Sequence, residues 1–210
     1  MARPNLLVGH WPPSGPGADD TYAIYGNFFY QNPTEALFQG EGNVAFYSNV
    51  LVNSSGDAIN VQPHNDVPRR IHVFRNTVLA ANHGIRVSGG HPDHVQRVTA
   101  NAVFARTPVA GGEQRLNVVG TPAQAVEYLA HPLAPPGQLD LSPRPGRLAT
   151  APFDAPEVEG VPDAGRDFDG RVYKSPVAGA YSDAEPAWRL QLAPKAKSEP
   201  PAGTKAAGDT

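Results

Sequence analysis

Six side chains between residues 60 and 88 have the chemical types that a site for a carboxylate-bearing ligand needs. Histidine can accept a proton near neutral pH, and arginine can hold a carboxylate through paired hydrogen bonds. Amides, hydroxyls and carboxylates can bind hydroxyl groups. The six residues are His64, Arg86, Asn60, Gln62, Asp66 and Ser88. Together they suit removal of a proton beside a carboxylate, with His64 as the base and Arg86 as the carboxylate-binding group.

These residues lie in stretches that resemble one another, because Ile59-Asn60-Val61 returns as Ile85-Arg86-Val87. Alternation of apolar and polar residues is typical of a β-strand. If Ile59 and Ile85 face inward, Asn60 and Arg86 are outward neighbours on strands about 4.8 Å apart. His64 then lies level with Gly90, so its backbone is roughly 13 to 14 Å from that of Arg86. A bound ligand fits between the two.

Two interleaved sets of alternating segments share one period along the chain. The first set contains Asn27, Asn49, Asn76 and Asn101, separated by 22, 27 and 25 residues. The second contains Leu6, Leu37, Ile59 and Ile85, separated by 31, 22 and 26 residues. A repeat of this length indicates a solenoid in which each unit buries its apolar face against its neighbours.

An all-β fold follows, a parallel β-helix of about four coils. Asparagine at the bend tolerates left-handed backbone and can hydrogen-bond to its equivalent in the next coil. The alternative is an antiparallel sandwich with the same alternation. That fold usually has two-residue Asn-Gly or Asp-Gly turns, whereas each of the four Asn residues lies inside a strand pattern.

The coils are expected over residues 1–120, followed by a short helix over 121–131 with Thr121 as N-cap and Pro122 at its first position. This helix is suited to cover the open end of the solenoid. Residues 132–194 form a proline-rich extension that packs partly on that end, and 195–210 have the composition of a disordered tail. Few residues precede Leu6, so we expect missing amino-terminal coils or a partner that covers the first coil.

Composition narrows the classes of function. A net charge of −3 and an isoelectric point near 6.1 give no basic field for nucleic acid. No segment approaches the roughly 18 apolar residues of a membrane span. The absence of cysteine excludes disulfides and thiolate metal sites, but it leaves the cellular compartment undetermined.

The coil pattern with its Asn positions resembles the right-handed parallel β-helix superfamily of pectate-lyase-like proteins. That superfamily includes polysaccharide lyases, glycoside hydrolases and uronan epimerases. The segment DFDGRVYKSPVAGAY, from Asp167 to Tyr181, is similar to an Asp-x-Asp-Gly … Gly-Ala-Tyr ending of its bacterial members. The resemblance covers residues 1–120 and 165–183. It implies a right-handed β-helix, a carbohydrate-active protein and an extracellular or periplasmic location.

A local motif resembles the Asp-Pro-His-Asp of mannuronan C5-epimerases. Pro63 and His64 match it, Gln62 and Asn65 replace its two aspartates, and Asp66 comes one place late. The resemblance implies chemistry of the lyase or epimerase type at uronate residues of an acidic polysaccharide. Either arginine or a Ca²⁺ ion can hold the uronate carboxylate in such chemistry. No other cofactor is indicated.

Each candidate also has a structural interpretation. His64 can cap the turn after Pro63, Arg86 can pair with a carboxylate such as Asp57, and Asn60 and Gln62 can extend an outward amide ladder. The corresponding alternative for the whole chain is a non-catalytic surface or carbohydrate-binding β-helix, or a truncated fragment without activity.

Two further polar groups are open to two interpretations. His91-Pro92-Asp93-His94 contains metal-ligand types, but proline prevents a helix from placing both histidines on one face, so we predict a solvated loop and no metal site. Glu35, Asp57 and His83 are expected at equivalent positions on successive coils. They form either a Ca²⁺- or sugar-contacting column or ordinary polar turns.

Overall fold

The computed structural model describes residues 3–9, 14–152 and 161–182. Three parallel five-stranded sheets make up most of it. Sheet A contains β1 (Leu6–Val8), β4 (Phe38–Gly40), β7 (Ile59–Val61), β10 (His83–Val87) and β13 (Thr107–Ala110). Sheet B contains β2 (Tyr22–Tyr25), β5 (Gly42–Tyr47), β8 (Pro68–Phe74), β11 (Gln96–Thr99) and β14 (Glu113–Arg115). Sheet C contains β3 (Phe28–Tyr30), β6 (Val50–Asn53), β9 (Thr77–Ala80), β12 (Ala102–Phe104) and β15 (Val118–Gly120).

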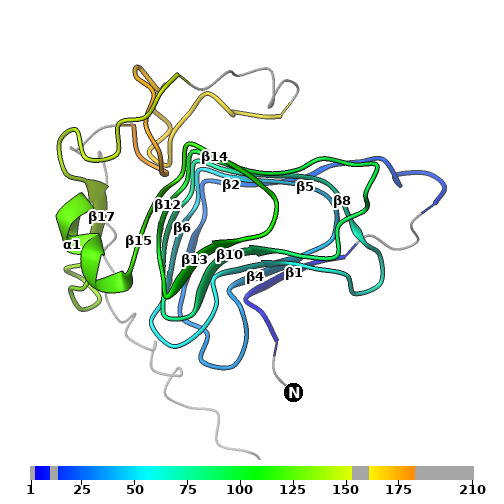
Figure 1. Ribbon diagram of the computed structural model, residues 1–210, viewed down its shortest axis with the longest axis horizontal. Coiled ribbons are helices and arrows are strands. Elements are labelled where there is room, and N and C mark those ends of the chain that lie inside the picture. Colours follow the sequence, from blue (N-terminus) through cyan, green and yellow to red (C-terminus); the bar gives the residue numbers. More distant parts are fainter. Residues whose placement is uncertain (1–2, 10–13, 153–160, 183–210) are drawn as a thin grey trace, which may run out of the picture.

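The chain visits sheets A, B and C in the same order at each level, and every strand pairs in parallel with the equivalent strand one level away. Viewed along the stack, the levels superimpose as a closed outline with sheet B opposite sheet A and sheet C joining them at one side (Figure 1). The fold is a right-handed parallel β-helix of about four turns, which confirms the predicted fold class.

The interior is filled by apolar side chains that stack from one level to the next. Ile59 pairs with Phe38 on one side and with Ile85 on the other, and all three are fully buried. The column predicted from the sequence was wrong at one position, because Leu6 pairs with Phe38 and not with Leu37. Leu37 is also fully buried, where the chain enters the strand. Because Leu37 and Phe38 are both apolar and both buried, the alternation of apolar and polar residues does not show which of them faces inward from the strand.

The predicted asparagine ladder is present at the corner between sheets B and C. Each Asn donates from Nδ2 to Oδ1 of the next, at 3.1 Å from Asn27 to Asn49, 3.1 Å to Asn76 and 2.9 Å to Asn101. Asn117 extends it at 3.0 Å. The sequence predicted a left-handed backbone at each Asn, but the structure has it at the residue before. The φ angles there are 48° to 65°, at Gly26, Ser48, Arg75, Ala100 and Leu116.

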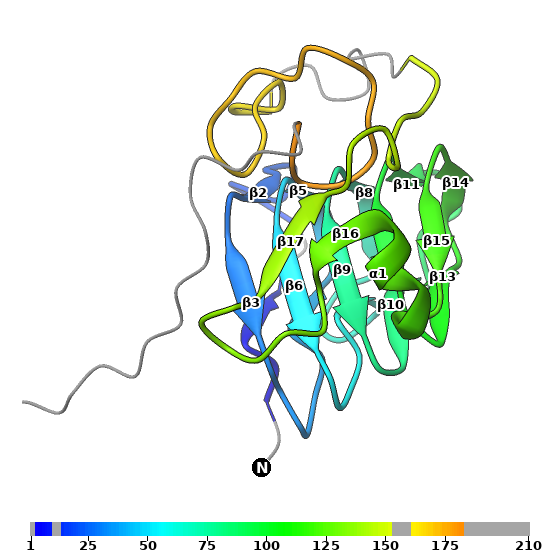
Figure 2. The same cartoon turned by 90° about the vertical axis from the view of Figure 1, so that its left-hand side faces the viewer.

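A small helical and hairpin layer covers the outward face of sheet C (Figure 2). A 3₁₀ turn, η1 (Pro122–Gln124), leads into α1 (Ala125–Tyr128), and the antiparallel pair β16 (Leu129–His131) and β17 (Asp140–Pro143) follows. Thr121 and Gln124 form a reciprocal capping box, and Pro122 opens the turn as predicted. Tyr128 packs on Phe104, with ring centroids 5.3 Å apart, so the helix lies beside the coils.

Residues 161–182 cover part of the outward face of sheet B (Figure 1). Tyr47 donates from its hydroxyl to the carbonyl of Pro162, and Arg75 Nη1 donates to the carbonyl of Ala164 at 3.2 Å. The Arg75 guanidinium lies 3.9 Å from the ring centroid of Tyr173. The predicted tail 195–210, and residues 183–194 of the predicted extension, lie outside the described residues.

Candidate functional site

Four of the predicted site residues form a polar row on the outward side of sheet A, where β7 and β10 run side by side. They are Asn60, Gln62, Arg86 and Ser88. Asn60 is in direct register with Arg86, as the repeat predicted. Arg86 donates from Nη2 to Oε1 of Gln62 at 2.6 Å, so the arginine and the amide of the neighbouring strand are joined. The sequence left open an ion pair between Arg86 and Asp57, but the contact that the structure shows for Arg86 is the one with Gln62.

His64 follows β7 in a loop that a buried glutamate holds. The carboxylate of Glu41 accepts hydrogen bonds from the backbone N–H of His64 at 2.6 Å and of Asn65 at 2.9 Å. Glu41 is only 1% exposed, whereas the side chain of His64 is exposed. The Glu41 carboxylate therefore holds the loop backbone in place, while the imidazole of His64 is exposed to solvent.

Asp66 and Ser88 differ in how much hydrogen-bonding capacity they keep. Asp66 accepts from the backbone N–H of Val67 at 2.7 Å and lies 3.2 Å from Arg69 Nη1, with a side chain only 7% exposed. Its carboxylate is thus engaged by its own loop. Ser88 is exposed, and its backbone N–H donates to the carbonyl of Val61 at 2.9 Å. Of the two, Ser88 is the more accessible to a ligand.

Asp57 and His83 form a carboxylate–imidazole pair at the amino-terminal ends of β7 and β10. Asp57 Oδ1 accepts from the backbone N–H of His83 at 3.1 Å and lies 3.3 Å from His83 Nδ1. Asp57 Oδ2 accepts from Asn60 Nδ2 at 3.2 Å. Burial alone would raise the pKa of the Asp57 carboxyl, but these hydrogen bonds hold that pKa below its usual value.

Glu35 does not belong to this pair, which corrects the predicted column. Because Phe38 pairs with Ile59, Ala36 and not Glu35 lies level with Asp57. The error has the same origin as the misplaced Leu37, a one-residue slip where the chain turns into sheet A. His83 pairs with Thr107 on the next strand, so the column continues with a hydroxyl.

Asn60 lies between the Asp57–His83 pair and the Arg86–Gln62 pair on the outward face of sheet A. It is 8% exposed, contacts Asp57 through Nδ2 and lies beside Arg86. Asn60 Oδ1 and Arg86 Nε are both buried and lack a hydrogen-bond partner among the described residues. Since buried polar atoms are normally paired, this acceptor and this donor retain unused capacity at the centre of the row.

The histidines of the 91–94 segment form a separate surface group. The rings of His91 and His94 have centroids 5.2 Å apart, and His91 Nδ1 accepts from the backbone N–H of Asp93 at 3.3 Å. Within the described residues, no three His, Asp or Glu side chains gather as metal ligands would.

Two features of the site were missed by sequence reasoning. Glu41 gave only a weak signal, a charged residue between two glycines. The contact between Asp57 and His83 was present in the sequence only as a shared level on successive coils. Neither pattern reveals which side chain is buried or which atoms meet.

Comparison with protein-family models, with curated proteins and with solved structures gives no match for this chain. In the part of the chain that the structure describes, no helix is long and apolar enough to cross a membrane.

Proposed function

We propose that the outward face of sheet A around Arg86 binds an acidic polysaccharide and acts at its uronate residues. The observation that carries this proposal is the contact of Arg86 with Gln62 beside Asn60, which puts one guanidinium among amides on adjacent strands. Guanidinium groups bind carboxylates, and amides bind sugar hydroxyls. An uncharged sugar would leave the cation unused.

The chemistry proposed for this face is removal of the proton α to the uronate carboxylate. Arg86 binds the carboxylate and stabilises the negative charge that develops on it. His64 is proposed as the base from the motif resemblance. Because Arg86 Nη2 donates to Gln62 Oε1, its guanidinium is directed toward the end of β7 that His64 follows. Asn60, Gln62 and Ser88 then contact hydroxyls.

The second candidate function is binding without catalysis. His64 and Ser88 are both exposed, so a polymer can lie across the strands without being enclosed. Catalysis by proton abstraction gains from exclusion of water, whereas recognition of a polymer does not require it. The resemblance to carbohydrate-active β-helices fits both candidates.

The test compares Arg86→Gln with the matched variant Arg97→Gln, whose arginine pairs with Glu113 on sheet B. Calorimetry with alginate, pectate and a glycosaminoglycan, each with and without Ca²⁺, measures affinity. Loss of a charge-assisted hydrogen bond in Arg86→Gln should weaken binding by about tenfold or more, while Arg97→Gln should bind like the wild type. A folded wild-type chain that binds none of these polymers would contradict the proposal.

A further inference from the structure

We propose that a groove between the β16–β17 hairpin and the carboxy-terminal extension binds an amphiphilic carboxylate. The apolar tail of this ligand lies in a cavity walled by prolines, and its carboxylate lies against Lys174. The groove shares no residue with the outward face of sheet A, so this inference is independent of the proposed function.

Two adjoining cavities form the groove. The larger has a volume of about 840 Å³ and lies between the hairpin with its following loop and residues 175–177 of the extension. The smaller has a volume of about 520 Å³ and is lined by residues of the extension alone. Ser175 and Ser182 line both cavities, which makes them continuous. Sites for small molecules usually have volumes of about 300 to 1,000 Å³, so the larger cavity can hold one.

The walls of the larger cavity are mostly apolar and are held together by backbone hydrogen bonds. Thr150 donates its backbone N–H to the carbonyl of Pro176 at 3.0 Å, and Ala178 donates to that of Leu148 at 2.8 Å. The apolar lining residues are Pro143, Pro145, Leu148, Ala149, Pro176 and Val177. Because proline fixes one backbone dihedral, these walls keep their shape without a ligand, and binding costs little ordering.

The smaller cavity provides the positive charge. Arg171 and Lys174 line it together with Ser175 and Ser182. Lys174 and Ser175 are exposed, and neither side chain has a hydrogen bond or ion pair with another residue of the described chain. None of the described residues that line either cavity is an aspartate or a glutamate. An ammonium beside a hydroxyl can hold a carboxylate through two donors.

Asp167 is the acidic residue bonded to the wall of the smaller cavity. Its Oδ2 accepts from the backbone N–H of Ser182 at 3.0 Å and from Ser182 Oγ at 2.5 Å, and its Oδ1 accepts from the backbone N–H of Arg171 at 2.8 Å. Asp167 is only 5% exposed, so its carboxylate is satisfied inside the extension. Lys174 is therefore the charge that a ligand can meet.

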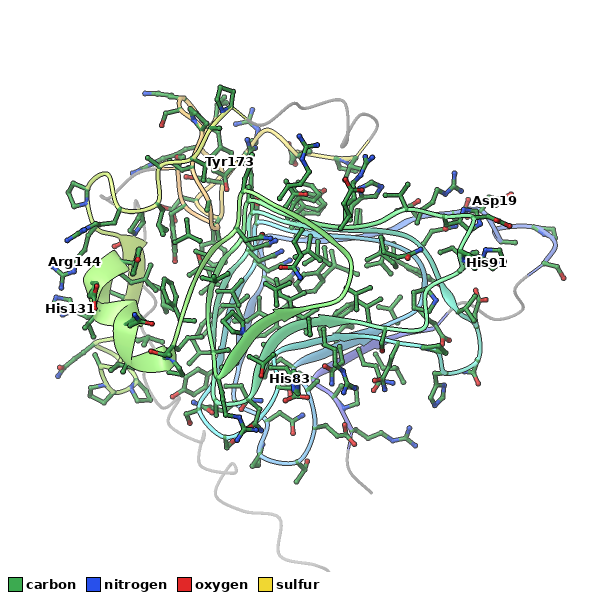
Figure 3. The ribbon with its side chains drawn as sticks, viewed as in Figure 1. Asp19, His83, His91, His131, Arg144 and Tyr173 are labelled. Carbon is green, nitrogen blue, oxygen red and sulfur yellow. The ribbon has the colours of Figure 1, made fainter. Side chains whose placement is uncertain are left out.

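Arg144 lines the larger cavity, but its guanidinium is already engaged. Nε donates to the carbonyls of Val126 and Leu129 at 2.8 and 3.0 Å, and Nη2 donates to that of Ala130 at 3.2 Å. Figure 3 shows Arg144 and His131 on the outer side of the hairpin. The carbonyl dipoles offset much of the arginine charge, which favours the smaller cavity for the carboxylate and the larger one for the tail.

The first experiment titrates the full chain with decanoate by calorimetry, below the concentration at which decanoate forms micelles. We expect saturable binding of one decanoate per chain. Hexanoate should bind more than about tenfold more weakly, because it buries fewer CH₂ groups. Decyltrimethylammonium, which has the same tail and the opposite charge, should neither bind in the groove nor displace decanoate.

Two substitutions test the two cavities separately. Lys174→Glu reverses the charge at the smaller cavity and should weaken decanoate binding by about tenfold or more. Ala149→Trp fills the larger cavity from an exposed position and should weaken binding at least as much. The matched control Arg106→Glu reverses the charge of an exposed arginine between β12 and β13, outside the groove, and should keep the wild-type affinity. Circular dichroism confirms that each variant is folded.

The inference is overturned if the wild type does not bind decanoate, if decyltrimethylammonium binds as tightly, or if Lys174→Glu or Ala149→Trp keeps the wild-type affinity. Equal losses in Lys174→Glu and Arg106→Glu would overturn it too, since the anion would then be held by the surface charge as a whole. A peptide of alternating glutamate and leucine that binds in place of decanoate would assign the groove to an acidic protein partner and overturn it as well. None of these outcomes bears on the binding of polysaccharide by Arg86.

Discussion

Asn76 shows how single side chains hold the corners of this solenoid. It is fully buried, donates to the carbonyls of Phe46 and Phe74, and passes the ladder on to Asn101. Its own Oδ1 accepts two hydrogen bonds from Asn49. Every hydrogen-bonding atom of this side chain is thus engaged in a place that water does not reach, and loss of the amide leaves several buried groups unpaired.

Asn76→Ala should therefore lower the free energy of unfolding by about 2 to 5 kcal/mol, because each unpaired buried group costs about 1 to 3 kcal/mol. The matched variant Asn27→Ala removes the exposed end of the same ladder and should cost less than about 1 kcal/mol. Urea denaturation followed by circular dichroism measures both. Similar losses in the two variants would show that burial of the ladder does not determine its contribution.

The ladder could be predicted from the sequence because its residues recur with the repeat and asparagine alone combines the required donor and acceptor. In sheet A the register of β7 and β10 was predicted to the residue, but that of β4 was not. Leu37 and Phe38 are both apolar and both buried, and Gly84 turns its backbone inward before Ile85. Alternation fails at such corners. The placement of His83 depends on that failure, so the contact with Asp57 required the structure.

The carboxy-terminal extension, residues 161–182, is attached through the turn at Gly179 and Ala180 and not through a strand in the coils. Gly179 donates its backbone N–H to the carbonyl of Ala100 at 2.8 Å, and Ala180 donates to Thr77 Oγ1 at 2.9 Å. Asp167 accepts from the backbone N–H of Arg171 at 2.8 Å and from that of Ser182 at 3.0 Å. The Asp-Phe-Asp-Gly … Gly-Ala-Tyr segment thus closes on itself and anchors the extension to the coils.

Gly179→Ala should detach this anchor. Gly179 has φ of +91°, and a Cβ there would lie 2.8 Å from Thr77 Oγ1 and 3.1 Å from the Ala102 Cβ. We expect a loss of about 1 to 2 kcal/mol from the left-handed backbone and about 1 to 3 kcal/mol more from the contact. Limited proteolysis should cut the extension faster.

Gly170→Ala is the matched control for that change. Gly170 also has a left-handed backbone, with φ of +78°, but a Cβ there meets nothing within 4 Å. It should cost only the backbone contribution of about 1 to 2 kcal/mol and leave proteolysis of the extension unchanged. Equal effects of the two substitutions would show that the contacts with Thr77 and Ala102 do not hold the extension.

Among the elements, the coils and the start of the helix were predictable, and the hairpin beside sheet C was not. Periodic alternation gave the strands, and Thr121 with Pro122 gave the helix start. The hairpin of β16 and β17 lies in a proline-rich stretch without alternation, and its apolar residues Leu139 and Leu141 are buried only because the outward face of sheet C is itself apolar. Such complementarity between distant segments leaves no local pattern.

At the scale of the whole molecule, stability should be highest in the middle of the stack. Each level contacts only the levels next to it, so an interior level has two partners and an end level has one. The burial of one column shows the difference. Ile59 is fully buried between Phe38 and Ile85, whereas Leu6, on the first level of the same sheet, is only partly buried.

Ile59→Ala should consequently lower the free energy of unfolding by about 2 to 5 kcal/mol, as expected for a large-to-small change in a packed core, and Leu6→Ala should cost less than half as much. Native-state hydrogen exchange should show the same gradient, with the amides of β7 and β8 most protected and those of β1 and β2 least. Since Arg86 lies on β10, which pairs with β7 on one side and β13 on the other, the proposed site is built on an interior level of the stack. Uniform protection from β1 to β10, or equal losses in the two variants, would contradict a stability that depends on neighbouring levels.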